Sequence, residues 1–154
     1  MSSEPKTIIE EYLAKMGLSA NYDDKRKQFV GTTKLKSPIT GRDYDYPFAI
    51  TMLPGWVVTE VAIVDLKTAP ADISLEKLYD SMLRTNFIIP EVNYALYNSL
   101  AVSLAWSKAS ALSFENFASE FYGVTAGVKV FFEVVTHAAR ISSPPPAKFT
   151  PMYQ

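Results

Sequence analysis

Apolar residues recur every three or four positions in the last third of the chain, and this run constrains the fold more than any other feature. Its members are Phe114, Phe117, Phe121, Val124, Val128, Phe131 and Val135. The spacing places them on one face of a helix, and Ser113 precedes the run as a capping residue. We therefore predict a long helix over residues 114–135. A strand over residues 128–134 is the alternative, because β-branched residues and the nearby Gly123 and Gly127 permit it.

Alternating side chains predict the strands of a sheet. The clearest run lies at residues 100–106, where large apolar residues alternate with alanine and serine after a turn at Asn98 and Ser99. A second tight turn, at Pro54 and Gly55, separates two runs rich in β-branched and other apolar residues. Together these patterns predict strands over residues 29–35, 48–53, 56–64, 92–97 and 100–106.

Two further segments have helical spacing. The first covers residues 5–16, with Pro5 in its first turn and Gly17 after its end. The second covers residues 74–87 and begins at Ser74, a good N-cap residue. We expect the apolar stripe of this second helix to consist of Leu75, Leu78, Met82 and Leu83.

The predicted order is α-β-β-β-α-β-β-α, which defines an α+β fold with an antiparallel sheet packed against helices. A chain of 154 residues, 48% of them hydrophobic, suits one globular domain. We place this single domain at residues 1–141. Residues 142–154 contain three consecutive prolines, Pro144 to Pro146, and are expected to form a flexible tail.

The residues needed for most site chemistry are missing from the sequence. It has no cysteine and one histidine, His137, so neither a thiolate nucleophile nor a common zinc site can form. Its six glycines form no phosphate-binding motif, and a net charge of -1 gives no basic footprint for nucleic acid. We expect no catalytic residue, metal or cofactor. With no apolar segment long enough for a membrane span, we expect a cytoplasmic protein.

The second half of the chain resembles a known family. The match lies in the helix at residues 74–87, the hairpin of residues 93–97 and 100–104, and the sequence Ser-Phe-Glu-Asn-Phe at residues 113–117 that opens the last helix. This arrangement resembles the type III secretion chaperone-like fold, including the YbjN-like group, over roughly residues 5–136. The resemblance implies a small homodimer without cofactors that binds extended segments of other proteins on apolar patches.

The leading functional hypothesis is therefore a non-catalytic protein-binding module, chaperone-like and homodimeric, with no nucleic-acid or membrane partner. The alternative is a small-molecule-binding protein or enzyme whose pocket lies between sheet and helix. The residues expected to contact a partner or line a pocket are Trp56, Tyr94, Tyr97, Trp106, Phe149 and Tyr153. Small residues at Gly123 and Gly127 further predict a close backbone approach, within the subunit or between subunits.

Overall fold

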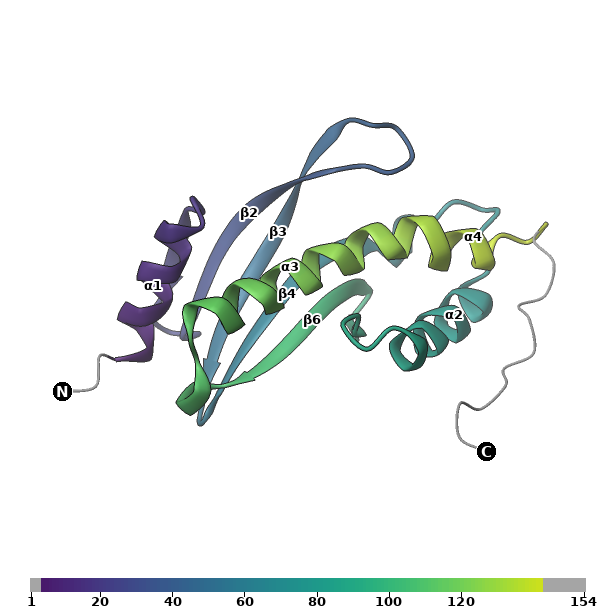
Figure 1. The fold of residues 1–154 in the computed structure, drawn as a ribbon. Helices are drawn as coiled ribbons and strands as arrows, with labels where there is room; N and C mark the ends of the chain where they lie inside the picture. The colour runs from purple at the N-terminus through teal and green to yellow at the C-terminus, as the bar shows by residue number, and fades with distance from the viewer. Residues whose placement is uncertain (1–3, 143–154) are drawn as a thin grey trace.

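The computed structural model describes residues 4–142, which form a six-stranded antiparallel sheet with helices along one face (Figure 1). The strand order is β1-β2-β3-β4-β6-β5. The strands are β1 (Ala20–Asp23), β2 (Gln28–Lys36), β3 (Asp43–Leu53), β4 (Trp56–Asp65), β5 (Tyr94–Tyr97) and β6 (Leu100–Lys108). Residues 143–154, most of the predicted tail, lie outside the described residues, and so do Phe149 and Tyr153.

The helices are α1 (Pro5–Lys15), α2 (Leu75–Ile88), α3 (Phe114–Val130) and α4 (Thr136–Ala139). A π-helical segment, η3 (Phe131–Val135), joins α3 to α4, and short 3₁₀ turns lie at η1 (Leu66–Thr68) and η2 (Ala109–Ala111). As predicted, Ser74 and Ser113 cap α2 and α3 by accepting hydrogen bonds from backbone N–H groups. None of the helices within residues 4–142 is long and apolar enough to cross a membrane.

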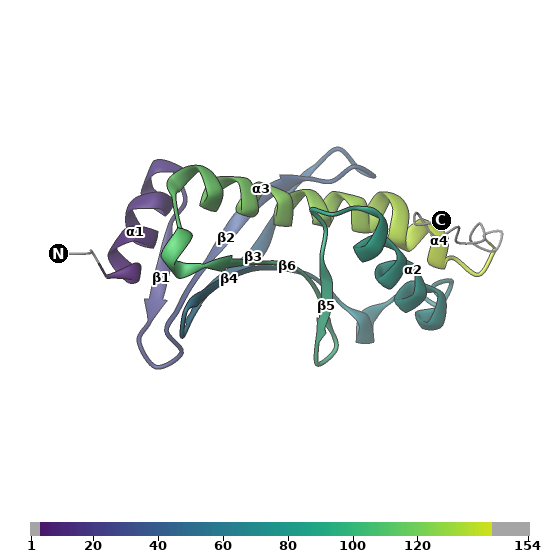
Figure 2. The ribbon, with the colours of Figure 1, turned by 60° about the horizontal axis from the view of Figure 1, so that its bottom comes forward.

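The helices lie on one side of the curved sheet, and the concave side is left uncovered by the described residues (Figure 2). The long helix predicted over residues 114–135 is confirmed, and the strand alternative over 128–134 is wrong. Phe131 and Val135 are fully buried in η3, so the apolar stripe continues through the π-helical segment. Because the stripe is continuous, this segment packs against the core as a helix and does not form a strand.

The predicted α+β order is confirmed, with one strand more than the five expected. β1 pairs antiparallel with β2, from Ala20 opposite Gly31 to Asp23 opposite Gln28. This strand has four residues and no run of alternating apolar side chains, so local sequence gives little indication of it. Hydrogen bonding to β2 determines the position of β1 instead.

The buried face of α2 differs from the one predicted. Leu78 and Met82 are buried, but Leu83 is 70% exposed and Leu75 is exposed as well. The reason is that α2 packs against η3, α4 and β5 at the end of the sheet, so a different side of the helix faces inward. The Asn86 side chain fixes this position through two hydrogen bonds with the backbone of Tyr94, of 2.6 and 3.0 Å.

Close packing of α3 on β6 depends on small residues. Gly127 lies against Ser103, and a Cβ atom at Gly127 would stand 3.1 Å from the Ser103 Cβ and closer still to its hydroxyl oxygen. The predicted close approach therefore occurs within the subunit at Gly127, whereas a Cβ atom at Gly123 would make only an ordinary contact, 3.5 Å from the Glu91 backbone oxygen. Nearer the start of the helix, Phe121 packs edge-on against Phe48 of β3, with ring centroids 5.3 Å apart.

Candidate functional site

The uncovered concave side of the sheet forms a broad hollow. Strand pairing aligns Val30, Ala49, Glu60 and Leu104 in one row across β2, β3, β4 and β6. Because side chains alternate along a strand, the residues two positions away in each strand point to the same side. The hollow measures about 580 Å³ and is open to solvent. Much of its lining is apolar and includes Val30, Ala49, Leu53, Val58, Ala62, Tyr97, Leu100, Val102 and Trp106.

β6 presents its large side chains to this concave side. Ala101, Ser103 and Ala105 are buried on the helix side, whereas Trp106 on the concave side is 54% exposed. The close approach of α3 leaves space only for small residues beneath it, which is why the large residues of β6 face the other way. Trp106 packs edge-on against Trp56 of β4, with ring centroids 6.2 Å apart. The two indoles form an apolar ridge at one end of the hollow.

Charge is sparse in the hollow. Among the described residues that line it, two carry a charge at neutral pH, Arg26 and Glu60. Arg26 lies at the β1–β2 turn, where its guanidinium stands 3.9 Å from the Asp23 carboxylate and is well exposed. Glu60 lies in β4, a central strand of the sheet, and partial burial raises the pKa of its carboxyl above the usual value. An apolar hollow with one carboxylate near its centre suits a partner surface better than acid–base chemistry.

The sequence-predicted aromatic residues divide between the two sides of the sheet. Tyr94 is buried on the helix side, with 6% of its surface exposed, and burial raises the pKa of its hydroxyl. Tyr97 and Trp106 line the concave hollow, and Trp56 contacts Trp106 beside it. The structure therefore does not arrange these four residues around one pocket between sheet and helix. Three of them share the concave side.

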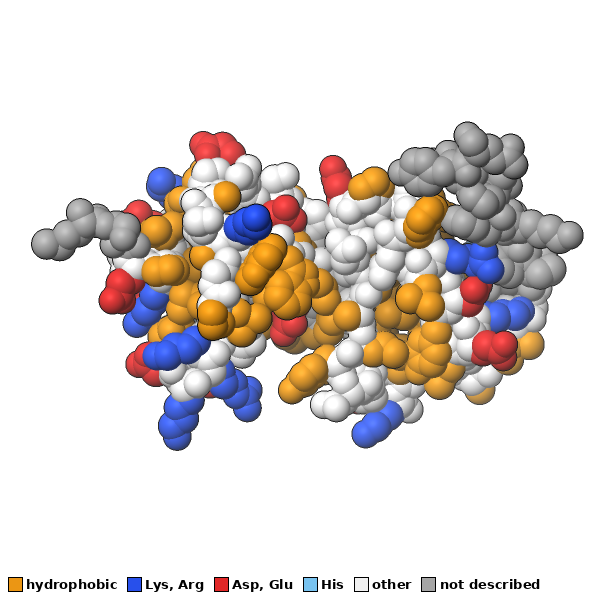
Figure 3. Space-filling model, turned by 90° about the horizontal axis from the view of Figure 1, so that it is seen from below, with side chains coloured by type: hydrophobic (Ala, Val, Ile, Leu, Met, Phe, Trp, Pro, Cys, Tyr) orange, Lys and Arg blue, Asp and Glu red, His pale blue; other side chains and the backbone are white. Residues whose placement is uncertain are grey.

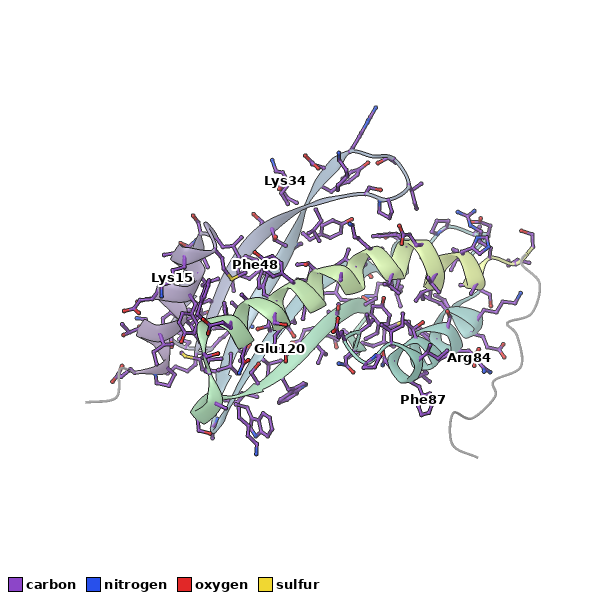
Figure 4. The ribbon with its side chains drawn as sticks, in the orientation of Figure 1. Lys15, Lys34, Phe48, Arg84, Phe87 and Glu120 are labelled. Atoms are coloured by element: carbon purple, nitrogen blue, oxygen red, sulfur yellow. The ribbon has the colours of Figure 1, made fainter. Side chains whose placement is uncertain are left out.

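A second apolar surface lies on α2 and was missed by sequence reasoning. Leu75, Tyr79, Leu83 and Phe87 follow one another at every fourth position, and all four are exposed. We call this set the α2 stripe. Figure 4 shows Phe87 and Arg84 pointing outward from α2. In Figure 3, hydrophobic side chains gather over α2 as well as over β6. The four-residue spacing is present in the sequence. The exposed set was missed because Leu75 and Leu83 were assigned to the core.

Polar side chains flank the α2 stripe. The Arg84 guanidinium donates a hydrogen bond of 2.7 Å to the Asp80 carboxylate one turn earlier. Both side chains are partly exposed, so the pair lies at the margin of the apolar surface. An apolar centre with a polar margin is the usual composition of a protein–protein interface.

Metal-binding residues do not cluster in the described part of the chain: no three His, Asp or Glu residues there are placed to hold an ion. His137 lies in α4, close to the end of the helical stretch, as the sequence predicted.

Comparison with known proteins identifies the fold. No protein-family model and no curated protein matches the sequence. Among solved structures, a chain of the ExsC–ExsE complex superposes with a TM-score of 0.59 and 11% identity, covering 93% of this chain and 98% of that one. A chain of the HopA1–SchA chaperone–effector complex gives 0.56 and 12% identity, covering 84% and 93% respectively.

A third similar structure is the heterodimeric ExoU–SpcU complex from the type III secretion system of Pseudomonas aeruginosa. The TM-score is 0.51 with 15% identity, over 78% of this chain and 91% of that one. Identities this low establish the architecture and do not carry over function. The resemblance read from the sequence is confirmed at that level: the chain has the fold of the type III secretion chaperones.

Proposed function

We propose that this protein is a non-catalytic, chaperone-like binding module that holds a segment of another protein on the concave side of its sheet. The observation that carries the proposal is the apolar hollow of about 580 Å³, with Trp106 exposed at its end. Exposed apolar patches rimmed by polar groups are typical of interaction sites. The similar solved structures support a protein partner, because one of them is a chaperone–effector complex.

The proposal includes a homodimer formed through the α2 stripe. A two-fold interface brings the same patch of each subunit together, so an apolar stripe along a helix can pack on its own copy. Asp80 and Arg84 lie beside the middle of the stripe. In an antiparallel helix pair, each Asp80 would face the Arg84 of the other copy. The polar margins of the two copies would then be complementary in charge. The dimer would act in the cytoplasm, the location expected from the sequence.

Site-specific photo-crosslinking tests the binding site. A photoreactive phenylalanine analogue replaces Trp106 in the hollow or, as a matched control, Tyr122 on α3, which is 63% exposed on the other side of the sheet. We expect a partner protein to crosslink through position 106 and not through position 122. Mass spectrometry of the adduct then identifies the partner and the segment that is bound.

A purified fragment containing that segment allows quantitative measurement. Trp106→Ala should weaken its affinity by about tenfold or more, because central aromatic residues dominate binding energy, while Tyr122→Ala should leave the affinity unchanged. Equal crosslinking at both positions, or unchanged affinity of the Trp106→Ala variant, would overturn the proposal.

A further inference from the structure

Glu60 has an apolar environment on the concave side. Ala49 and Leu104 stand opposite it on the two neighbouring strands, and Val58 and Ala62 are its neighbours along β4 on the same side. Within residues 4–142, its carboxylate forms no hydrogen bond and no ion pair. Solvent therefore provides the stabilisation that this charge requires in the free protein.

A segment bound in the hollow would displace that solvent. An ionised carboxylate that loses water without gaining a partner is strongly unfavourable, and removing one member of a buried charge pair greatly weakens binding in measured complexes. Arg26 is already close to Asp23 at the β1–β2 turn. A cation supplied by the bound segment would compensate Glu60 without drawing Arg26 away from Asp23.

We infer that the hollow selects a segment in which one lysine or arginine is flanked by apolar residues, with the cation placed against Glu60. This inference rests on the proposed function. Apolar neighbours of the basic residue match Val58, Ala62 and Leu104 around the carboxylate. Glu60 is thus a specificity-determining residue: apolar contacts supply affinity, and the carboxylate fixes the register of the segment along the hollow.

Selection from a random twelve-residue peptide library displayed on phage tests the inference with the full-length protein. Peptides are selected on the wild-type protein, and those that lose binding to the Trp106→Ala variant are kept as ligands of the hollow. We expect these ligands to be enriched in a single basic residue between apolar ones. Selection on the Glu60→Gln variant, which keeps the shape of the side chain, should lose that enrichment. Arg26→Gln, which removes the other charge of the hollow, should retain it.

One selected peptide and its counterpart with glutamine in place of the basic residue then provide a double-mutant cycle. The substitution should weaken binding to the wild-type protein about tenfold or more and leave binding to Glu60→Gln unchanged. Ligands of the hollow without basic enrichment, or enrichment that persists on Glu60→Gln, would overturn the inference and leave the proposed function intact. A library that gives no Trp106-dependent ligand would overturn both.

Discussion

The hydroxyl of Tyr94, on the edge strand β5, donates a hydrogen bond of 2.6 Å to the backbone carbonyl of Gly127 in α3. The bond links an edge of the sheet to the last turn of α3, just before the π-helical segment η3. The Tyr94 ring also packs edge-on against Phe131, with centroids 5.7 Å apart. One side chain thus connects strand, helix and core.

Removing this hydroxyl should destabilise the protein. Tyr94→Phe keeps the ring contact with Phe131 but loses the hydrogen bond, and we expect the free energy of unfolding to fall by about 1 kcal/mol in urea titrations. Tyr97→Phe is the matched control, because Tyr97 is largely exposed on the same strand. Equal stability of wild type and Tyr94→Phe would show that the bond contributes nothing.

Tyr94 also predicts how stability depends on pH. Burial raises the pKa of its hydroxyl above the ordinary value of 10.0, so the folded state holds this proton after the unfolded state has released it. Its contribution is therefore complete below pH 10 and is lost as the pH rises further. The free energy of unfolding of the wild type should decrease as the pH rises above about 10. The decrease should be smaller in Tyr94→Phe; identical slopes would contradict the assignment.

The contact between Gly127 and Ser103 makes a prediction about packing. Gly127→Ala should lower the free energy of unfolding by about 1–3 kcal/mol, because the new methyl group collides with the Ser103 side chain. Gly123→Ala should be neutral or stabilising, since its Cβ would have ordinary contact at 3.5 Å and alanine favours helix.

Combining Gly127→Ala with Ser103→Ala should recover part of the loss. The Ser103 hydroxyl is buried without a hydrogen-bond partner in the described structure, so its removal relieves the collision at little cost. A double variant no more stable than Gly127→Ala alone would locate the strain elsewhere.

Phe121 tests the helix stripe predicted from the sequence. The structure buries this ring against Phe48, so Phe121→Asp should destabilise the fold itself by about 4 kcal/mol or more. Circular dichroism and thermal melting measure the loss, and Tyr122→Asp at the exposed neighbouring position should melt like the wild type. A stably folded Phe121→Asp variant would show that the stripe does not form the core.

The α2 stripe predicts how the protein associates. Leu83→Asp should shift sedimentation from dimer to monomer without lowering the melting temperature measured under monomeric conditions, because Leu83 is 70% exposed. Val30→Asp, on the concave side, should remain dimeric. If the wild type sediments as a monomer at micromolar concentration, or if Val30→Asp alone dissociates, the α2 stripe is not the dimer interface.

Local sequence predicted most of the elements because periodicity is a local property. The stripe from Phe114 to Val135 and the alternation at residues 100–106 were sufficient for α3 and β6, and the serines at 74 and 113 marked two helix starts. Where prediction failed, tertiary contacts decided. β1 exists because β2 pairs with it, and the buried side of α2 was set by its position beside η3 and α4.

The candidate site depends on longer-range placement. β4 and β6 have apolar residues at positions that point to both sides of the sheet, so their sequences alone do not say which side a helix will cover. The close fit of Gly127 to Ser103 places α3 on the side of the small β6 residues and leaves Trp106 on the other. Strand pairing then sets Glu60 between Ala49 and Leu104. The sequence thus determined most of the elements through its local periodicity. The open side and its carboxylate were decided by the tertiary structure, since they arise from contacts between residues far apart in the chain.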